Sequence, residues 1–294
     1  MSELGFTYYP GCSQSGSAEE YGDSSEAVCQ ALGIELTELP DWSCCGASSA
    51  HMTNDVLSVA LPGRDLAAAK RLGRDVLVVC AACYSRMKIS QARILADEEL
   101  AREVEAAIGA DPRFTGKVRH LLDVMVNDIG PANLKEEVLL PLEGLKAVPY
   151  YGCLLVRPPE VCFCDSVENP TDLDRFMEAL GVEAKPWSFK TDCCGGSLSL
   201  SRADVVEKLV NKLFRRAGEA GANCIVAACP MCVANLEMRQ QPGRLSFKIN
   251  HPMPVLYFTE LLALAMTLPG AKKWLKSHII DPMPLMVETK LMSV

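Results

Sequence analysis

Apolar runs that end at a cysteine occur once in each half of the chain. Residues 76–79 are all aliphatic and precede Cys80, and residues 225–228 precede Cys229 in the same way. Short, continuous apolar runs next to helical patterns are typical of buried strands in α/β layers. Each cysteine would then lie at the carboxyl end of a strand, where the loops of open α/β sheets converge. We therefore expect an α/β fold of two pseudo-symmetric domains, each with a small parallel-type sheet and flanking helices.

Helical patterns lie between these runs. Residues 17–32 and 84–108 are predicted to form helices, and residues 205–214 keep a 3.6-residue apolar period that leads up to Gly218. The sequence Ser-Arg-Ala-Asp at 201–204 resembles a capping box that would begin this last helix. The helix would cover one face of a sheet.

The middle of the chain predicts a connection between two domains. Residues 131–149 begin and end with proline and are interpreted as a connector. We therefore predict an N-terminal domain over residues 1–145 and a C-terminal domain over residues 146–294.

Composition and charge narrow the classes of function. Hydrophobic residues make up 49% of the chain and charged residues 22%, so a folded core is expected. With 29 basic and 37 acidic residues the net charge is −8, which gives no electrostatic reason to bind nucleic acid. The N-terminal sequence lacks the pattern of a secretory signal, and the apolar stretch 255–268 is interrupted by Glu260 and is near the length of a core helix. We therefore expect a cytoplasmic protein without a membrane span.

Fourteen cysteines in such a chain indicate metal, cluster or redox chemistry, because cytosolic thiols are kept reduced. Ten of them form one pattern written twice: a single cysteine, then Cys-Cys-Gly, then Cys-x-x-Cys. The second and third elements are separated by 34 residues in both halves, which indicates an internal duplication. The ten are Cys12, Cys44, Cys45, Cys80 and Cys83 in the first half, and Cys153, Cys193, Cys194, Cys229 and Cys232 in the second.

The number of thiols in each half discriminates among cofactors. Zinc takes four ligands in a closed structural site, and a cubane [4Fe-4S] cluster also takes four, usually from a run of closely spaced cysteines that is absent here. Five thiolates on four irons require either a thiolate that bridges two irons or an extra ligand on one iron. A noncubane [4Fe-4S] cluster in each half therefore fits the count.

Local sequence around the cysteines agrees with iron binding. Adjacent cysteines in an extended segment point to opposite sides and can hold different irons. Gly46 and Gly195 would let the backbone pass close to a cluster. The Cys-x-x-Cys elements are expected to open helices, whose positive N-terminal end favours the thiolate, and Pro230 suits a first helical turn.

Two other interpretations stay open. One half could hold zinc, because a Cys-x-x-Cys with two further cysteines is an ordinary structural zinc site. The Cys-Pro-Met-Cys at 229–232 could instead exchange disulfides as thioredoxin-like proteins do, but this leaves unexplained the six cysteines of the repeated pattern that lie outside the two Cys-x-x-Cys elements.

The repeated cysteine pattern resembles the cysteine-rich CCG domain, and the chain as a whole resembles the B-type polypeptide of heterodisulfide reductase. The resemblance covers nearly the full length. It includes Arg-Pro-Pro-Glu at 157–160, Glu-Asn-Pro at 168–170 and the segment 254–262. Relatives of this kind occur in methanogens, sulfate reducers, sulfur oxidisers and acetogens.

The resemblance implies a catalytic subunit that reductively cleaves a disulfide, such as that of coenzyme M and coenzyme B, between two noncubane [4Fe-4S] clusters. By this resemblance the five cysteines of each half hold one cluster. It also implies two partner polypeptides of the complex, one ferredoxin-like (C-type) and one flavin-containing (A-type). The sequence itself has no nucleotide-binding glycine motif, so electrons are expected from such partners. The alternative is an electron-transfer subunit, linked to a sulfur carrier or a quinone, without disulfide chemistry of its own.

Six other residues have no assigned role in the pattern. Cys29, Cys162, Cys164 and Cys224 are expected to be small buried side chains. His51 lies six residues after Cys45 and could approach a cluster or donate a proton, although a structural role is favoured. Arg157 could bind an anionic substrate group or form a structural ion pair.

Overall fold

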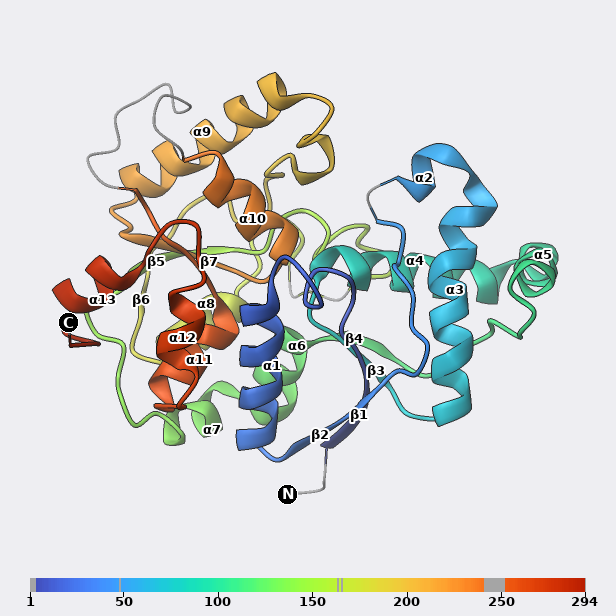
Figure 1. Ribbon diagram of the computed structural model, residues 1–294, viewed down its shortest axis with the longest axis horizontal. Helices are drawn as coiled ribbons and strands as arrows, with labels where there is room; N and C mark the ends of the chain where they lie inside the picture. Colours follow the sequence, from blue (N-terminus) through green and yellow to red (C-terminus); the bar gives the residue numbers. More distant parts are fainter. Residues whose placement is uncertain (1–3, 48, 163, 165, 241–251, 294) are drawn as a thin grey trace.

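Two parallel sheets with the same strand order form the framework of the molecule. In the computed structural model, which describes residues 4–47, 49–162, 164, 166–240 and 252–293, the orders are β2-β1-β3-β4 and β6-β5-β7-β8. All six strand pairings are parallel. Helices flank both sheets, and the two halves form two lobes in Figure 1. The α/β fold with two repeated sheets is therefore confirmed.

The first half carries four strands with a helix or turn after each. Its strands and helices are β1 (Leu4–Tyr9), α1 (Glu19–Ala31), β2 (Ile34–Glu38), α2 (Ala50–Thr53), α3 (Asp55–Leu72), β3 (Val76–Val78), α4 (Ala81–Ala96), α5 (Glu98–Ile108), β4 (Val118–His120), α6 (Leu121–Asp123), the π-helical segment η1 (Val124–Ile129) and α7 (Pro131–Glu136).

The second half repeats this strand order. Its strands and helices are β5 (Lys146–Tyr150), α8 (Asp172–Ala179), β6 (Glu183–Ala184), the 3₁₀ turn η2 (Gly196–Leu198), α9 (Ala203–Glu219), β7 (Cys224–Ala227), α10 (Pro230–Met238), β8 (Val255–Tyr257), α11 (Phe258–Ala265), α12 (Ala271–Leu275) and α13 (Met283–Glu288).

Equivalent strands end at equivalent points in the two sheets. In the first sheet Val78 at the end of β3 is paired with His120 of β4. In the second sheet Ala227 at the end of β7 is paired with Tyr257 of β8. His120 and Tyr257 thus occupy matching positions at the carboxyl edges, and each is followed directly by a helix.

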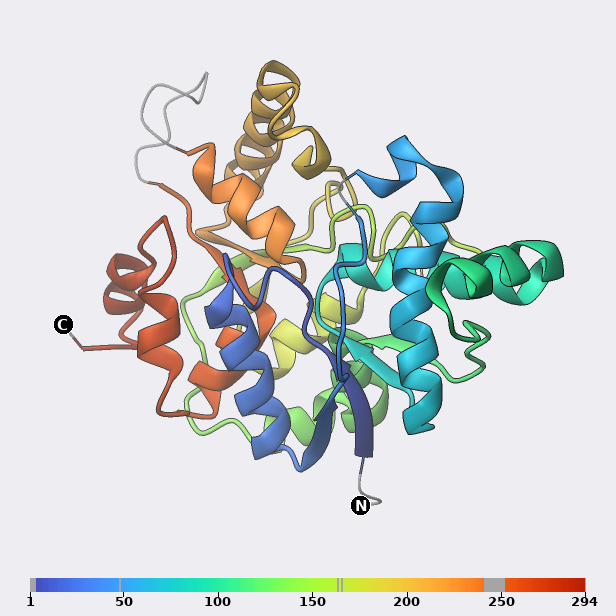
Figure 2. The same cartoon turned by 45° about the vertical axis from the view of Figure 1, so that its right-hand side comes forward.

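The two halves exchange helices across their boundary. Helix α1 of the first half packs against α11 and α12 of the second, and α8 of the second half packs against η1 and α7 of the first. Figures 1 and 2 both show α1 beside the C-terminal helices. Tyr21 stacks on Tyr257 with ring centroids 4.1 Å apart, and Ser24 Oγ lies 2.8 Å from Thr259 Oγ1. Much of the apolar core is therefore shared by both halves.

Four sequence predictions about helices and the connector need correction. The helix expected over 84–108 is two helices, α4 and α5, because the Asp97 carboxylate accepts hydrogen bonds from the amides of Glu99 and Leu100 and begins a new helix. The stretch 255–268 is a short strand, β8, followed by α11, because β8 completes the buried edge of the second sheet.

The capping box expected at 201–204 is also wrong. Helix α9 does begin at Ala203, but no side chain caps it. The Asp204 carboxylate instead accepts two hydrogen bonds from the Arg202 guanidinium, each of 2.9 Å.

The predicted connector 131–149 contains regular structure at both ends. It begins with α7 and ends in strand β5, so only its middle is irregular. The amides of Leu139 and Leu140 both donate to the Ala265 carbonyl at 2.9 Å, which fixes this segment to the second half. The domain boundary at residue 145 stays a prediction; β5 begins one residue later.

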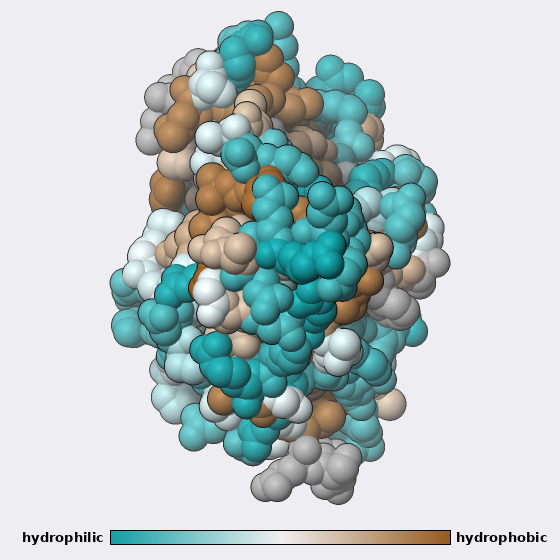
Figure 3. All heavy atoms as spheres, turned by 90° about the vertical axis from the view of Figure 1, so that its right-hand side faces the viewer, coloured by the Kyte–Doolittle hydropathy of each residue, from teal (hydrophilic) through white to brown (hydrophobic). Residues whose placement is uncertain are grey.

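One face of the molecule is largely polar. The face of the molecule that carries α5 is mostly hydrophilic, as Figure 3 shows, and only Leu100, Ala101 and Val104 of that helix are buried. Among the described residues, no helix combines the length and the apolar character that crossing a membrane requires.

A buried charged cluster fixes the C-terminal segment. The His278 ring is 2.8 Å from Glu237 Oε1 of α10 and 2.9 Å from Glu260 Oε2 of α11, and all three side chains are almost fully buried. Glu20 of α1, half-buried, also faces this cluster. Although burial opposes protonation, the two bonded carboxylates outweigh it and raise the pKa of His278 to about 11.

We predict that His278→Leu destabilises the fold by about 3–5 kcal/mol near neutral pH, because it leaves two buried carboxylates without their cation. Since the folded-state pKa of His278 is raised above the ordinary value of 6.5, its stabilisation is complete below pH 6.5 and is lost as the pH rises toward 11. Urea unfolding of the variant and of the wild type should therefore converge as the pH rises.

The matched control is His51→Leu, because His51 is exposed on α2. This control should change the unfolding free energy by less than about 0.5 kcal/mol at every pH. A pH-independent loss in His278→Leu would show that packing, and not charge, is what His278 contributes.

Candidate cluster-binding sites

Each cysteine of the repeated pattern lies at or near the carboxyl edge of its sheet. Cys12 follows β1 and Cys153 follows β5. Cys80 and Cys229 are the N-cap residues of α4 and α10, directly after β3 and β7, and Pro230 takes the first helical position. The prediction that the Cys-x-x-Cys elements open helices is confirmed. The helix N-termini favour negative charge on these thiols.

Thiols of the first half contact one another in pairs. We call Cys12, Cys44, Cys45, Cys80 and Cys83 the N-terminal set. The Sγ atoms of Cys45 and Cys83 are 3.1 Å apart, and those of Cys12 and Cys44 are 3.9 Å apart. Cys44 is exposed and Cys45 is buried. Their thiols nevertheless hydrogen-bond to each other, so the expectation that the adjacent side chains point to opposite sides is wrong for this pair.

The second half repeats these pairs. We call Cys153, Cys193, Cys194, Cys229 and Cys232 the C-terminal set. Cys194 Sγ is 3.5 Å from Cys232 Sγ, and the Cys153 and Cys193 thiols also hydrogen-bond to each other. Again the first of the adjacent cysteines is exposed and the second is buried. All five members of the C-terminal set line a single cavity.

Contacts among the thiols favour the thiolate at three of these cysteines, one in the N-terminal set and two in the C-terminal set. Hydrogen bonds from Cys44 and Cys83 lower the pKa of Cys45 to about 4. A hydrogen bond from Cys153 lowers the pKa of Cys193 to about 6. Hydrogen bonds from Cys232 and Cys80 hold the pKa of Cys229 well below its usual range. Iron and zinc are bound by thiolates, so this arrangement prepares both sets for a metal group.

The two sets meet at the boundary between the halves. The thiols of Cys80 and Cys229, the first cysteines of the two Cys-x-x-Cys elements, hydrogen-bond to each other and are fully buried. Ala81 and Ala82, which belong to the first half, also line the cavity of the C-terminal set. The two candidate sites are therefore neighbours.

Glycines leave room beside the thiols. Gly11 and Gly152, each directly before the first cysteine of its set, have φ values of +76° and +67°. A Cβ atom at Gly152 would lie 3.1 Å from Cys232 Sγ, and one at Gly11 would lie 3.4 Å from Cys83 Sγ. A side chain at Gly152 would therefore press on a predicted ligand, whereas one at Gly11 would press on the Tyr9 ring at 3.1 Å and only touch Cys83.

The structure adds a pair of tyrosines that sequence analysis did not assign. The hydroxyl of Tyr9 donates to the Ser43 carbonyl, and the hydroxyl of Tyr150 donates to the Asp192 carbonyl, both at 2.7 Å. Each bond holds the residue before the adjacent cysteines. The signal was present in the sequence, because both tyrosines stand three residues before the first cysteine of their set.

The cysteines outside the pattern are mainly buried. Cys29 and Cys224 are fully buried in α1 and β7, and burial raises the pKa of each to about 12. Cys162 is buried, and burial raises its pKa to about 11. Cys164 is half-buried and lines a small cavity beside His120, away from the thiols of the C-terminal set.

His51 and Arg157 do not join the thiol sets. His51 is exposed on α2. Arg157 donates from Nη1 to the Thr191 carbonyl at 3.1 Å and from Nη2 to Glu168 Oε1 at 2.8 Å. The structural ion pair is thus formed, with Glu168 of the Glu-Asn-Pro segment as partner. His251 lies outside the described residues.

The donor set suits a multinuclear group. Each half offers five thiols and no competing carboxylate among the contacts described above, and thiolates are the ligands of iron-sulfur clusters. Within the described part of the chain, no group of three or more Cys, His, Asp or Glu side chains is gathered around the position of a single metal ion. The ten-ligand assignment itself stays a prediction.

Comparison with known proteins places the chain in a family. The model of the cysteine-rich domain (CCG) matches it twice, at residues 6–88 and 147–237. The chain therefore belongs to the family of proteins with two cysteine-rich CCG domains, and its relatives support a subunit of the heterodisulfide reductase type.

Three relatives match over most of their length. The chain is 32% identical to the B-type polypeptide of the ferredoxin/F420H2-dependent CoB-CoM heterodisulfide reductase of Methanosarcina acetivorans, over 81% of both chains. It is 32% identical to a protein of Archaeoglobus profundus named for its likeness to the same polypeptide, over 87% of this chain and 88% of the relative. It is 29% identical to the 8-methylmenaquinol:fumarate reductase membrane anchor subunit of Wolinella succinogenes, over 94% and 97%.

A solved structure shares the fold. The crystal structure of a hypothetical protein from Helicobacter pylori superposes with a TM-score of 0.73 at 11% sequence identity. The match covers 96% of this chain and 52% of that protein, so the present chain spans about half of its length.

We predict that Cys45→Ser and Cys194→Ser each remove one cluster and leave the other, because the two thiol sets belong to different halves. Iron and acid-labile sulfide should fall from about eight to about four per chain. Cys29→Ala is the control and should keep the full content, because Cys29 is buried in α1 away from both sets. Loss of a cluster in Cys29→Ala would contradict the partition of the cysteines.

We also predict that Gly152→Ala lowers the iron content of the C-terminal site, because its Cβ would press on Cys232 Sγ. Gly33→Ala is the matched control: its φ is +71°, yet no atom lies within 4 Å of the added Cβ. Both variants carry a backbone cost of roughly 1–2 kcal/mol. Equal iron contents in the two variants would show that the close approach to Cys232 is unimportant.

Proposed function

We propose that the chain holds two noncubane [4Fe-4S] clusters and serves as the disulfide-cleaving subunit of a heterodisulfide-reductase-type complex. The observation that carries this proposal is the duplicated convergence of five thiols at two adjacent sheet edges, with Cys80 and Cys229 in contact. Relatives named for the B-type polypeptide of heterodisulfide reductase support it.

The chemistry requires two electrons and two protons, which convert one disulfide into two thiols. Bound iron-sulfur clusters supply single electrons, so two adjacent clusters match the two-electron requirement. The N-terminal set would hold one cluster and the C-terminal set the other. Cys12, Cys44 and Cys193 are the most accessible thiols, so the two sites would open to substrate on the side of the loops after β1, β2 and β6.

The residues around the thiols would hold the loops in place for this reaction. The hydroxyls of Tyr9 and Tyr150 fix the peptide before each adjacent cysteine pair. Lys212 pairs with Asp192 at 2.7 Å and holds the second of these loops from the side of α9. Two partner polypeptides, one ferredoxin-like and one flavin-containing, would deliver the electrons.

A second function is favoured by one specific comparison. The relative from Wolinella succinogenes is named as a subunit of a menaquinol-linked fumarate reductase and matches over nearly the full length of both chains. On this alternative the two clusters relay electrons between a quinol and a partner enzyme and never contact a disulfide.

Metal analysis with spectroscopy tests the proposal. We expect about eight irons and eight sulfides per chain in protein purified without oxygen, and an EPR signal that changes when coenzyme M thiol or its heterodisulfide with coenzyme B is added. Zinc in place of iron in either half would overturn the two-cluster proposal.

The same samples distinguish the two functions. Signals that ignore thiols and disulfides but are reduced by a menaquinol analogue would support the electron relay and refute disulfide cleavage by this chain. Cys29→Ala protein provides the control for loss of iron during preparation.

A further inference from the structure

Asp65 of α3 is a buried carboxyl group beside the loop of the N-terminal set, and its residue exposure is 1%. Its Oδ1 atom accepts a hydrogen bond from the Ser43 amide at 2.8 Å, and the Ser43 hydroxyl lies 3.4 Å from the same atom. Ser43 directly precedes Cys44 and Cys45. Asp65 therefore holds the loop that carries two predicted ligands.

The second oxygen of this carboxyl group is not stabilised in the same way. Oδ2 is buried and has no hydrogen-bond partner among the described residues. Arg64, the preceding residue of α3, pairs instead with Asp41 at 2.6 Å on the surface. A charged carboxylate is costly in this position, because burial removes its hydration and no hydrogen bond replaces it at Oδ2. Protonation of Asp65 reduces this cost.

Three ionisable groups act on Asp65: Cys45, Arg64 and Tyr9. Burial raises the pKa of Asp65 to about 7; the Ser43 amide and Arg64 oppose this increase, and negative charge on Cys45 adds to it. Tyr9 stays neutral, because burial holds its pKa far above the ordinary value. More negative charge at the N-terminal set would therefore favour the protonated form of Asp65.

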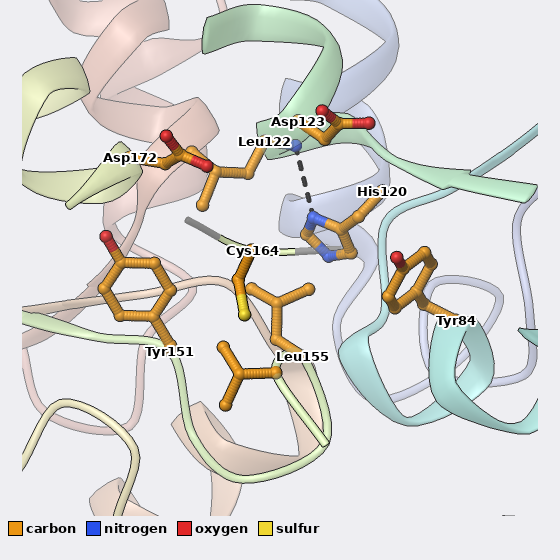
Figure 4. A pocket seen from close by; sticks show the side chains of 9 residues that line it. Tyr84, His120, Leu122, Asp123, Tyr151, Leu155, Cys164 and Asp172 are labelled. Atoms are coloured by element: carbon orange, nitrogen blue, oxygen red, sulfur yellow. Dashed lines mark hydrogen bonds between the residues drawn. The ribbon is translucent and has the colours of Figure 1, made fainter. Parts of the chain in front are cut away.

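Carboxylates at the boundary between the halves have cations beside them. Asp123 and Asp172 line the small cavity shown in Figure 4. Arg119 pairs with Asp123 at 2.7 Å, and Arg175 pairs with Asp172 at 2.8 Å. Such pairing stabilises the charged form, so these two carboxylates differ from Asp65.

The second half has no carboxyl group at the position that matches Asp65. The spacing after the adjacent cysteines is the same in both halves, so Asp65 corresponds to Phe214, which is buried in α9. Asp192, directly before the adjacent cysteines of the second half, pairs with Lys212 at 2.7 Å and is partly exposed. The buried carboxyl group is thus a feature of the N-terminal site.

We propose that Asp65 takes up one proton when the N-terminal site receives one electron, and releases that proton when the electron leaves. The carboxylate and the proton form a neutral carboxyl group, so the charge of the proton balances the charge of the electron. The electron comes from a partner polypeptide and the proton from water. The hydroxyl of the half-buried Ser43 lies beside Oδ1 and offers a route for the proton.

This inference rests on the proposed pair of clusters, and it holds for disulfide cleavage and for electron relay alike. The experiment titrates protein with both clusters loaded with dithionite and follows the EPR signals at several pH values. Cys44→Ser and Cys193→Ser, each of which leaves one thiol set intact, assign the signals to their sites.

In the wild type the midpoint potential of the N-terminal cluster should be constant well below pH 7, where Asp65 is already protonated. Above about pH 7 it should fall by up to about 59 mV per pH unit, the one-electron equivalent of a tenfold change in proton concentration. Asp65→Asn keeps a carbonyl acceptor for the Ser43 amide but takes up no proton, so its N-terminal potential should not depend on pH. The C-terminal potential should be the same in Asp65→Asn and the wild type.

Tyr9→Phe is the matched control. It removes the hydrogen bond to the Ser43 carbonyl and leaves the Asp65 carboxyl group in place, so the dependence on pH should persist. The same dependence on pH in Asp65→Asn as in the wild type would overturn the inference, as would its loss in Tyr9→Phe.

If Asp65→Asn fails to fold, infrared difference spectra of the wild type replace it. Reduction above pH 7 should produce the C=O band of a protonated carboxyl group, and the absence of this band would overturn the inference.

Failure of the proposed function gives a different result. Wild-type protein that lacks two iron-sulfur clusters refutes the function itself before any dependence on pH is compared. Two clusters whose potentials do not depend on pH refute the proton uptake alone.

Discussion

The contact between Cys80 and Cys229 depends on a constraint that acts on the whole chain: two parallel sheets must present the same edge to each other. In each sheet the third strand to enter, β3 or β7, lies in the interior and ends in the N-cap cysteine of a helix. The common strand order, with the halves turned so that these edges meet, brings both cysteines to the same place. The fully buried strands and the aromatic cluster around Tyr21 and Phe258 maintain this arrangement.

Each thiol set contains both buried and more accessible cysteines. The second of each pair of adjacent cysteines is buried, as are those of the Cys-x-x-Cys elements, where strand and helix fix them. Cys12, Cys44 and Cys193 lie on loops and are exposed. Each site therefore has an inner side of buried cysteines at the ends of strands and helices and an outer side of exposed cysteines on loops. This arrangement suits a group that is held by the protein and accepts a ligand from solution.

The hydrophobic pattern of the sequence predicts the strands that end at the sheet edges, but it does not predict where the helices begin and end. The apolar runs before Cys80 and Cys229 predicted β3 and β7, because buried parallel strands leave a clear composition. The break at Asp97 was missed, because its carboxylate caps a helix inside a long helical pattern. The cap predicted near Ser201 does not form, because the Asp204 carboxylate accepts hydrogen bonds from Arg202 instead.

For the site as well, features carried by local spacing could be predicted, and contacts between distant segments could not. The repeated spacing identified the ten cysteines, and the structure places five of them around one cavity. Tyr9 and Tyr150 stand at the same distance before the first cysteine of their set, but their role depends on the carbonyls of loops more than thirty residues away. His120 is matched by Tyr257 in the second sheet, so the repeat of the backbone does not extend to the side chain at this position.

The exchange of α1 and α8 across the boundary bears on how such a chain could arise. Each half covers its own core with a helix from the other, so either half alone would leave the apolar surface under α11 or η1 open to water. A precursor with a single copy would also have exposed this apolar surface. Two identical chains could have covered it by exchanging the helix that corresponds to α1 or α8 across a two-fold axis. Fusion of the two copies then allows them to diverge. Histidine at position 120 and tyrosine at the matching position 257 are one such difference, which two identical chains could not have had.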